Sequence, residues 1–459
     1  MTIPTPKMYP MKRQNAVERM GDTTLAAYNP QVSSTRKTVS KFSLITLALL
    51  FLVNFSTFSQ ISGTKTIGAT GDYFNLTSAF AAITTQSLNG NIVLQLAADY
   101  PDVGNPETFP IVAPTSSSIG SFTVNVYPTA GGLTITGNSA TGILNLSGTK
   151  NITIDGRVNA VGTTTDLVIA NSDITSGYVV QFANISTANT LRYCSIRGGS
   201  TTATSGVVVF GSSAATGNNN NLISNCSIRD AGSGLPTIGI YALGNASFPN
   251  TTNTIDNCNI FNFFNATLAS QGINIGAGNT GWSITNNNFY QQSTRTGTAI
   301  ATATCTSILV ANTAGNGFVI NDNFIGGNNT NAGGTWVATG GLNRIFGISV
   351  TVGNTTATSI QNNTIRNFSV STNVAVSPVW AGIVVQNGSV NVGTVSGNVI
   401  GAPTGTGNID ITLGGGGNSL QAYGIWATAI VAASTVNVSN NTMGSITLNG
   451  SNNNYSLGF

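Results

Sequence analysis

The feature that most constrains this chain is a six-residue motif that recurs eight times between residues 191 and 443. Each copy reads apolar, any residue, polar, Cys or Asn, any residue, apolar, with Tyr193 and Gly397 as exceptions at the third position. The copies are LRYCSI (191–196), ISNCSI (223–228), IDNCNI (255–260), ITNNNF (284–289), INDNFI (320–325), IQNNTI (360–365), VSGNVI (395–400) and VSNNTM (438–443). Their last residues are separated by 32, 32, 29, 36, 40, 35 and 43 residues. A period of this length predicts a solenoid of stacked coils.

A second apolar segment recurs with the same rhythm and usually begins at a glycine. Its copies are SGYVVQF (176), SGVVVF (205), IGIYAL (238), QGINIG (271), TSILVA (306), FGISVT (346), AGIVVQ (381) and YGIWAT (423). Each repeat therefore contains at least two short strands joined by Gly and Asn turns, and we expect insertions of variable length to account for the unequal spacing. Shorter apolar segments between residues 91 and 170 extend the pattern, so the sequence predicts an all-β fold.

The composition excludes several kinds of active site. Charged residues make up only 6% of the chain, against roughly 25% in an ordinary soluble domain. The chain has no histidine, which removes His-containing triads, His-ligated zinc and an imidazole base. It has 54 glycines, which disfavour long helices. Strands and tight turns must therefore build most of the molecule.

The Cys or Asn position of the motif predicts a ladder of side chains along the stack. Asn suits this position because its amide can both donate and accept along the stack, and because its backbone tolerates the left-handed conformation of a sharp turn. Cys fits there as a small buried side chain, and we expect free thiols, with Cys305 also unpaired. The position is occupied by Cys194, Cys226, Cys258, Asn287, Asn323, Asn363, Asn398 and Asn441.

The amino-terminal region is expected to differ from the coils. Residues 1–59 are predicted to be a leader with a signal peptide whose hydrophobic core is 42–53, a segment too short to span a bilayer. Seven basic residues lie in this leader, which leaves 9 basic and 11 acidic groups from residue 60 onward, so we expect no nucleic-acid partner. We assign 60–120 to an amino-terminal cap and the first strands, with a short helix at 77–86, and 121–459 to the coils.

From about residue 90 onward, the repeats resemble those of right-handed parallel β-helix proteins of the pectin-lyase-like superfamily. This resemblance implies a single right-handed parallel β-helix solenoid with a short amino-terminal capping helix. The segments GDYFNLTSAFAAI (71–83), NIVLQLAADY (91–100), PETFPI (106–111) and NITIDGR (151–157) resemble the amino-terminal part of surface proteins exported by type IX secretion. Such proteins end in a sorting domain, and nothing after Met443 resembles one. We therefore expect either a fragment of a longer protein or a different export route.

Few residues could carry polysaccharide cleavage, which the superfamily suggests as an activity. Glycoside hydrolysis needs two carboxylates across the scissile bond, and elimination needs a base. Beyond the leader the chain has one glutamate, Glu107, and ten scattered aspartates. Asp230 beside Arg229 is the strongest candidate pair, whereas Asp256 and Asp322 fall inside the motif and are expected to cap turns. No metal site and no cofactor is expected.

The residue that follows each copy of the motif predicts a stripe on the surface of the solenoid. Alternation sends this residue away from the core. Arginine and aromatic side chains at this position could stack on sugar rings or pair with acidic glycans. The alternative is that they only pack on each other. The stripe consists of Arg197, Arg229, Phe261, Tyr290 and Arg366, and Trp282, Trp336, Trp380 and Trp426 are expected in loops or the core.

These observations leave three hypotheses for the function. The first is a secreted or cell-surface β-helix that acts as a structural, adhesive or glycan-binding module without catalysis, with an extracellular polysaccharide as partner and no membrane span after removal of the leader. The second is a polysaccharide lyase or glycoside hydrolase that uses Asp230, Arg229 or neighbouring residues. The third is a passenger segment whose active domain lies beyond residue 459.

Overall fold

The computed structural model describes residues 61–458, apart from short gaps at 233, 299–302, 342–343, 375, 406–407, 415–419, 429–430 and 451–454. The chain divides into two compact units, and the second, Phe58–Phe459, contains the fold described below. The leader and signal peptide predicted for 1–59 lie outside the described residues. No helix among the described residues is long and apolar enough to cross a membrane.

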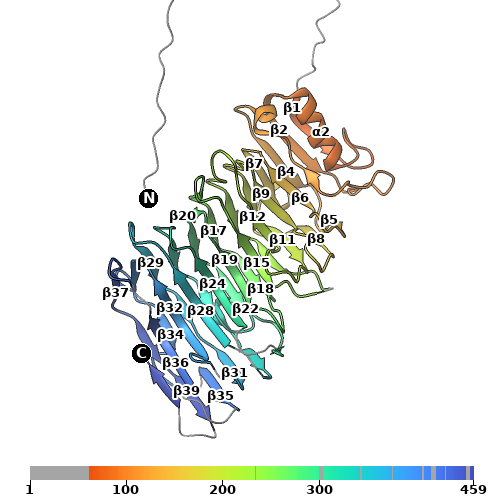
Figure 1. The fold of residues 1–459 in the computed structure, drawn as a ribbon. Helices are drawn as coiled ribbons and strands as arrows, with labels where there is room; N and C mark the ends of the chain where they lie inside the picture. Colours follow the sequence, from red (N-terminus) through yellow and green to blue (C-terminus); the bar gives the residue numbers. More distant parts are fainter. Residues whose placement is uncertain are drawn as a thin grey trace, which may run out of the picture. The chain divides into compact units, whose positions relative to one another are not determined.

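Three long sheets run along the stack, and all their strand pairs are parallel (Figure 1). The 12 strands of sheet A are β1 (Ile61–Ile67), β2 (Leu88–Leu96), β4 (Val124–Pro128), β7 (Ile152–Asp155), β10 (Thr190–Arg192), β13 (Leu222–Ser224), β17 (Thr254–Asp256), β21 (Ser283–Thr285), β25 (Val319–Asn321), β29 (Thr358–Gln361), β33 (Val390–Val392) and β37 (Val436–Val438). The 10 strands of sheet C are β5 (Leu133–Gly137), β8 (Leu167–Asn171), β11 (Cys194–Gly198), β14 (Ser227–Asp230), β18 (Asn259–Phe261), β22 (Asn288–Tyr290), β26 (Phe324–Ile325), β30 (Thr364–Ile365), β34 (Val399–Gly401) and β38 (Thr442–Gly444).

The second apolar segment of each repeat forms sheet B. Its 11 strands are β3 (Ile111–Val112), β6 (Leu144–Ser147), β9 (Val180–Ala183), β12 (Val208–Phe210), β15 (Ile238–Ala242), β19 (Ser270–Ile275), β24 (Thr304–Ala311), β28 (Arg344–Thr351), β32 (Trp380–Asn387), β36 (Leu420–Ala427) and β40 (Tyr455–Gly458). Successive strands belong to sheets A, C and B in turn, so each repeat is one coil. The prediction of an all-β parallel β-helix is confirmed.

A fourth sheet occurs only in the later coils. Its five strands are β23 (Arg295–Thr296), β27 (Trp336–Thr339), β31 (Phe368–Thr372), β35 (Ile409–Leu413) and β39 (Ile446–Gly450), which lie between sheets C and B along the chain. A two-stranded sheet consists of β16 (Asn250–Thr251) and β20 (Asn279–Thr280), which lie between sheets B and A along the chain. The expectation that insertions explain the unequal repeat lengths is therefore incomplete, because much of the added chain forms a regular strand.

The short helix predicted at 77–86 is α2 (Leu76–Gln86), at the amino-terminal end of the stack (Figure 1). Asn75 caps it, since its side chain accepts from the Ser78 amide. Glu107, from the following coil, accepts from the Leu76 and Thr77 amides at 2.7 and 2.9 Å, where a carboxylate also balances the helix dipole. The apolar face of α2 is buried, so the helix covers core at this end. The other helical turns are α3 (Ser116–Ile119), η1 (Val158–Ala160) and η2 (Thr330–Ala332).

The core consists of apolar side chains stacked in register along the sheets. One row in sheet A joins Ile154, Leu191, Ile223, Ile255, Ile284, Ile320, Ile360 and Val392, all essentially inaccessible to solvent. Each such side chain contributes about 1.5–3 kcal/mol by leaving water. Trp282, Trp336 and Trp380 also lie in the core. With so few charges, hydrophobic burial must hold the coils together.

The predicted asparagine ladder is present in the later coils. The Asn287 side chain donates to the Asn323 side-chain oxygen at 3.1 Å, and Asn323 donates to Asn363 at 2.9 Å. Asn398 and then Asn441 continue the series, with 2.8 Å at each step. The members before Asn441 are fully buried, and their amides also bond to backbone carbonyls. A buried amide that lacked these partners would cost about 1–3 kcal/mol.

The left-handed backbone conformation was expected at the ladder position, and this expectation is wrong. It belongs to the preceding residue, for example Asn257 (φ 51°), Asn286 (φ 58°) and Asp322 (φ 61°). The sharp turn between sheets A and C falls at that residue, while the ladder side chain points into the core. Asp256 and Asp322 do accept hydrogen bonds from turn residues, namely Asn286 and Asn362 respectively.

The cysteines of the ladder have free thiols, as expected. Cys194, Cys226 and Cys258 are fully buried, and each thiol lies 3.3 Å from the carbonyl oxygen two residues earlier. Burial raises the pKa of Cys226 and Cys258 and raises that of Cys305 to about 12. The thiols of Cys226, Cys258 and Cys305 are therefore protonated and unreactive at neutral pH.

Candidate functional site

Most of the predicted stripe does form a continuous stack. Arg197 and Arg229 are paired in register on β11 and β14. The Arg229 guanidinium lies 4.9 Å from the centre of the Phe261 ring, and that ring stacks on Tyr290 with 4.6 Å between centres and 10° between planes. The in-register stacking of four coils thus brings these side chains together on the outer side of sheet C.

The stripe offers little surface to a ligand. Phe261 is 5% exposed and Tyr290 6%, because their faces are used by neighbouring side chains. The 3-10 turn η2 packs against β22 and β26, and Arg366 lies beyond it, where its guanidinium donates to the Asn331 carbonyl at 3.2 Å. The structure therefore does not bring Arg366 to the other four. This geometry matches the alternative of mutual packing, and sugar binding by the stripe stays a prediction.

The candidate pair Arg229 and Asp230 belongs to a buried polar network. The Asp230 carboxylate lies 3.3 Å from the Arg229 guanidinium and accepts from the Asn262 amide at 2.7 Å. Asn262 in turn accepts from Arg295 at 2.6 Å, and Arg295 donates to Gln291. Asp230 is 8% exposed. A carboxylate that is so enclosed, with an arginine and an amide both held at its Oδ1, stabilises the corner of the coil and has little access to a substrate.

A different surface has the features of a binding site: the outer face of sheet B in the later coils. The recurring glycine of this strand sits where the backbone approaches its neighbours closely. A Cβ atom at Gly347 would lie 2.5 Å from the Gly382 carbonyl oxygen and 3.0 Å from the Ile365 side chain. The Cβ position of Gly347 therefore faces the core. Phe346, just before the glycine, and Ser349, two residues after it, face outward.

These two outward positions form rows that cross the strands. Row one consists of Gln271, Thr306, Phe346, Ala381 and Tyr423, and row two of Asn274, Leu309, Ser349, Val384 and Trp426. Phe346, Ala381 and Val384 form an apolar cluster, separate from the main core, against which Tyr423 and Trp426 pack. The Tyr423 and Trp426 rings are nearly parallel, with 5.6 Å between centres and 14° between planes.

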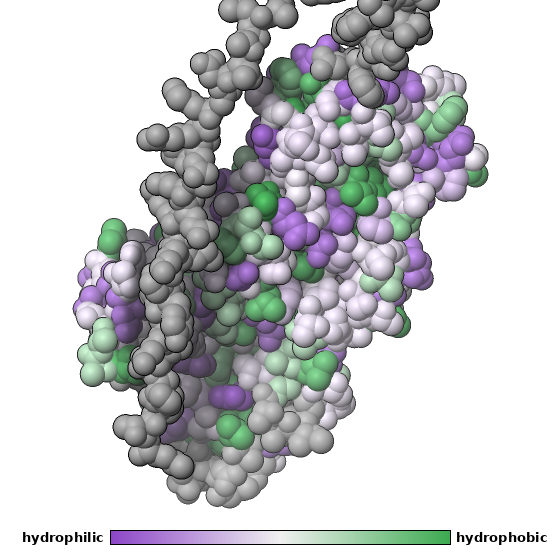
Figure 2. All heavy atoms as spheres, turned by 45° about the horizontal axis from the view of Figure 1, so that its top comes forward, coloured by the Kyte–Doolittle hydropathy of each residue, from purple (hydrophilic) through white to green (hydrophobic). Residues whose placement is uncertain are grey.

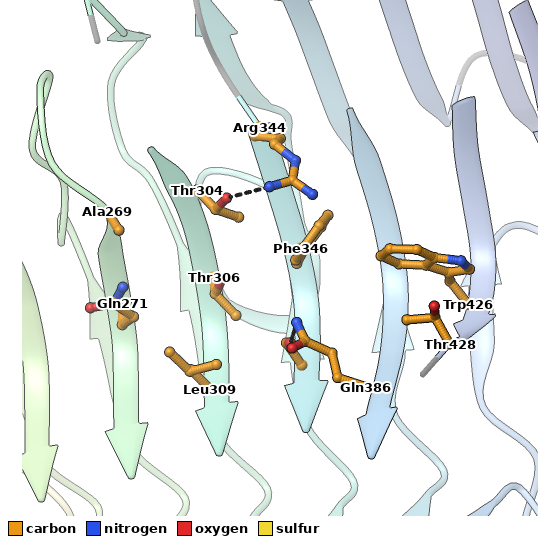
Figure 3. A pocket seen from close by; sticks show the side chains of 11 residues that line it. Ala269, Gln271, Thr304, Thr306, Leu309, Arg344, Phe346, Gln386, Trp426 and Thr428 are labelled. Carbon is orange, nitrogen blue, oxygen red and sulfur yellow. Dashed lines mark hydrogen bonds between the residues drawn. The ribbon is translucent and has the colours of Figure 1, made fainter. Parts of the chain in front are cut away.

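A groove of about 360 Å³ lies over these rows (Figure 3). Its side chains come from β19, β24, β28, β32 and the β36 region, five adjacent positions of the sheet. Pockets of this size, with apolar walls and a few polar groups, are typical of ligand sites. The groove is lined by Ala269, Gln271, Thr304, Thr306, Leu309, Arg344, Phe346, Ser349, Gln386, Trp426 and Thr428.

Among the described residues that line the groove, Arg344 is the one charged side chain. Its guanidinium lies 4.8 Å from the centre of the Phe346 ring and covers it, so that Phe346 is only 5% exposed. Its Nε donates to the Pro378 carbonyl at 2.7 Å and a terminal nitrogen donates to the Thr304 hydroxyl at 3.3 Å (Figure 3). Burial lowers the pKa of Arg344. These bonds fix a cation at the edge of the groove, close to an aromatic ring.

Sequence reasoning missed this groove although the signal was present. The glycine-opened strand was recognised in every repeat, and the residues on either side of its glycine include Phe346, Tyr423 and Trp426. An alignment of the repeats at the position before the glycine and the position two after it contains row one and row two. The space-filling view also shows hydrophobic residues as separate patches among polar and neutral ones on the face drawn (Figure 2).

No protein-family model and no curated protein matches the chain. Among solved structures, it is similar to PfbA, a surface adhesin of Streptococcus pneumoniae, with a TM-score of 0.38 and 10% identity over 77% of this chain and 87% of that chain. It is also similar to an alginate lyase from Paenibacillus sp. str. FPU-7, with a TM-score of 0.35 and 14% identity over 83% of this chain and 99% of that chain. Both TM-scores are low, so the functional argument rests on this chain's own residues.

Within the described ranges, no three His, Cys, Asp or Glu side chains gather as metal ligands would.

Proposed function

We propose that the protein is a surface-displayed β-helix that binds an extended polysaccharide in the groove over sheet B, as an adhesive module that does not cleave it. The observation that carries this proposal is the combination, along one groove, of Trp426, amide and hydroxyl groups, and Arg344; the Trp426 ring is supported from outside the lining by the parallel ring of Tyr423. Sugar rings have apolar faces that stack on aromatic rings and hydroxyls that bond to amides such as Gln271 and Gln386.

The direction of the groove favours a polymer. Its lining spans five adjacent strands of a parallel sheet, which corresponds to about 19 Å at 4.8 Å per strand. A chain that lies across the strands would pass one side chain of each row at every step, because each row repeats one position of the coil. A monosaccharide would occupy only one part of such a site.

The absence of a carboxylate from the groove lining argues against hydrolysis. Hydrolysis requires an acid and a second carboxylate several Å apart across the bond, and the lining residues that the structure describes include neither Asp nor Glu. Asp230, on sheet C, is enclosed in its own network.

One observation favours the alternative of a lyase. Elimination needs a base, and burial lowers the pKa of Arg344. Its hydrogen bonds to the Pro378 carbonyl and the Thr304 hydroxyl oppose this role, because both favour the charged form.

Affinity electrophoresis against a panel of neutral and uronate-containing polysaccharides tests the proposal. We expect retention by at least one of them, and roughly tenfold weaker binding for Trp426→Ala, which corresponds to about 1.4 kcal/mol. Phe248→Ala is the matched control, because Phe248 is a 38% exposed aromatic residue outside the groove. Equal retention of Trp426→Ala and the native protein would refute the proposal. Absorbance of an unsaturated product, lost in Arg344→Gln, would establish the lyase instead.

A further inference from the structure

A second, independent feature lies at the amino-terminal end of sheet C. Sheet A begins with β1 and β2, but sheet C begins only with β5, one coil later than β2. In the coil of β2, residues 97–110 pass the place where a strand of sheet C would lie, and they form no strand there. One strand position of the stack is therefore left open beside β5.

The exposed edge of β5 carries backbone groups suited to pair with another strand. β5 pairs with β8 on one side, where the Gly137 carbonyl accepts from the Ser172 amide at 2.9 Å. Because backbone groups alternate between the two edges of a strand, those of Thr134 and Thr136 point to the opposite edge. None of the described residues in 97–110 forms a backbone hydrogen bond with them. Such an edge is a template for a further strand.

A cavity of about 240 Å³ separates this edge from the 97–110 segment. Its far wall is fixed, since Glu107 is held by the two helix amides and by the Tyr100 hydroxyl at 2.7 Å. Phe109 packs against Gly137 at one end, and Val103 is 95% exposed at the rim. The cavity is lined by Pro101, Asp102, Val103, Pro106, Glu107, Phe109, Thr134, Ile135 and Thr136.

The charge of the cavity is negative. Its lining contains two carboxylates and no basic residue among the described side chains. The Asp102 carboxylate is at the surface, and hydrogen bonds from the Asn105 side chain and the Gly104 amide lower its pKa. Both carboxylates accept hydrogen bonds from the chain, but Asp102 lies at the surface, so it is the one that a ligand can reach.

We propose that this open position binds an extended peptide segment of a partner protein, which adds to β5 as a strand and places a basic side chain against Asp102. Strand addition satisfies the edge groups of Thr134 and Thr136, which a glycan cannot do at the spacing of a strand. The strands of sheet C already form one hydrogen-bonded series from β38 to β5, so the peptide extends this series by one strand. The surface is remote in the chain from the groove over sheet B and does not depend on it.

Hydrogen exchange with a synthetic peptide tests this proposal on the full chain. The probe is RVTVTVR, used beside an analogue N-methylated at every second residue along one edge and another methylated along the other edge. We expect exchange at the Thr134 and Thr136 amides to slow at least tenfold with the unmethylated probe, and one of the two analogues to lose binding because its edge cannot pair. Asp102→Asn should weaken binding several-fold, and Trp426→Ala should leave it unchanged.

Three results would overturn the proposal. The first is equal binding by both methylated analogues, and the second is protection confined to residues away from β5. The third is full protection of Thr134 and Thr136 before any peptide is added, which would mean that another part of this chain or a second copy already fills the position. Because all of these are read without a destabilising mutation, misfolding cannot explain them.

Discussion

The coils up to β22 and the coils from β23 onward differ by one strand, and this difference explains the repeat lengths. The early copies of the motif are 29 to 32 residues apart and the later ones 35 to 43, because each later coil adds a strand of the fourth sheet between sheets C and B. Large aromatic side chains pack in the interior beside this sheet: Trp336, Phe368 and Trp380 contact one another in series, and Phe263 of the preceding coil contacts Trp336, with 5.3–5.9 Å between ring centres.

The comparison shows how a repeat protein can acquire a site without altering its core pattern. The ladder and the sheet A core continue through both regions, while only the later coils carry the long strands β24, β28, β32 and β36 that build the groove. Four predictions test this comparison.

The largest effect is expected from Trp336→Ala, which leaves a cavity in the core beside the fourth sheet. We expect a loss of roughly 3–5 kcal/mol in the free energy of unfolding, measured with denaturant, and faster hydrogen exchange in the fourth sheet. Phe182→Ala, a fully buried residue of the three-sheet coils, should cost a similar amount and leave glycan retention unchanged. If Trp336→Ala and Phe182→Ala reduced glycan retention equally, the groove would depend on the three-sheet coils as much as on the four-sheet coils, and the comparison would fail.

Removing one member of the polar ladder should have the next largest effect. Asn363→Ala removes the hydrogen bonds that the backbone and side-chain amides of Asn323 donate to it and the one that it donates to the Ile320 carbonyl, so we expect a loss of roughly 2–4 kcal/mol in the free energy of unfolding. Cys226→Ala, at the same motif position in the three-sheet coils, should cost only about 1–2 kcal/mol, because no amide loses a partner. Thermal and denaturant unfolding measure both; equal losses would show that the ladder hydrogen bonds add nothing beyond packing.

Alkaline pH should destabilise the cysteine-containing coils selectively. The folded-state pKa of Cys226 and of Cys258 lies above the ordinary thiol value, so their contribution is complete below about pH 9 and is lost as the pH rises, by up to about 1.4 kcal/mol per pH unit and thiol. Unfolding free energies from pH 8 to 10 measure this slope. Cys226→Ala combined with Cys258→Ala should flatten it, and an unchanged slope would assign the effect to tyrosines such as Tyr178, whose pKa is raised to about 12.

The smallest effect is expected at the stripe on sheet C. Arg197→Ala should change the free energy of unfolding by no more than about 0.5 kcal/mol, because its guanidinium is partly exposed and bonds to Ser195. Glycan retention should also stay unchanged, since Phe261 and Tyr290 are covered. A clear loss of retention would instead support the stripe as the binding surface and would move the site to the three-sheet coils.

The sequence was sufficient to predict the coils but not their cross-section. The motif identified the turn between sheets A and C, since every copy has a Cys or Asn there, which is buried in all copies but the last. The fourth sheet has no such marker: VSNNTM and ISNCSI have the same pattern although their coils differ by a strand. The groove also escaped prediction, because Phe346 lies on β28 whereas Tyr423 and Trp426 lie on β36, and these strands are brought together only through the register of the sheet.

Two further asparagine ladders escaped prediction for a similar reason. Asn189, Asn221 and Asn253 are linked side chain to side chain at 3.1 and 3.0 Å, and Asn218 donates to Asn250 at 2.8 Å. All are buried. They recur at intervals of 32 residues, but in runs so rich in Asn that no single position stands out.

The bonds of the ladder all point the same way, since the side chain of each member from Asn287 to Asn398 donates to the one in the next coil. Each of these coils therefore depends on its neighbour, because its ladder side chain donates to an acceptor in the next coil. Under tension applied to the carboxy-terminal end, the last coil would detach first and expose the next, so the molecule would yield in small successive steps instead of rupturing at once.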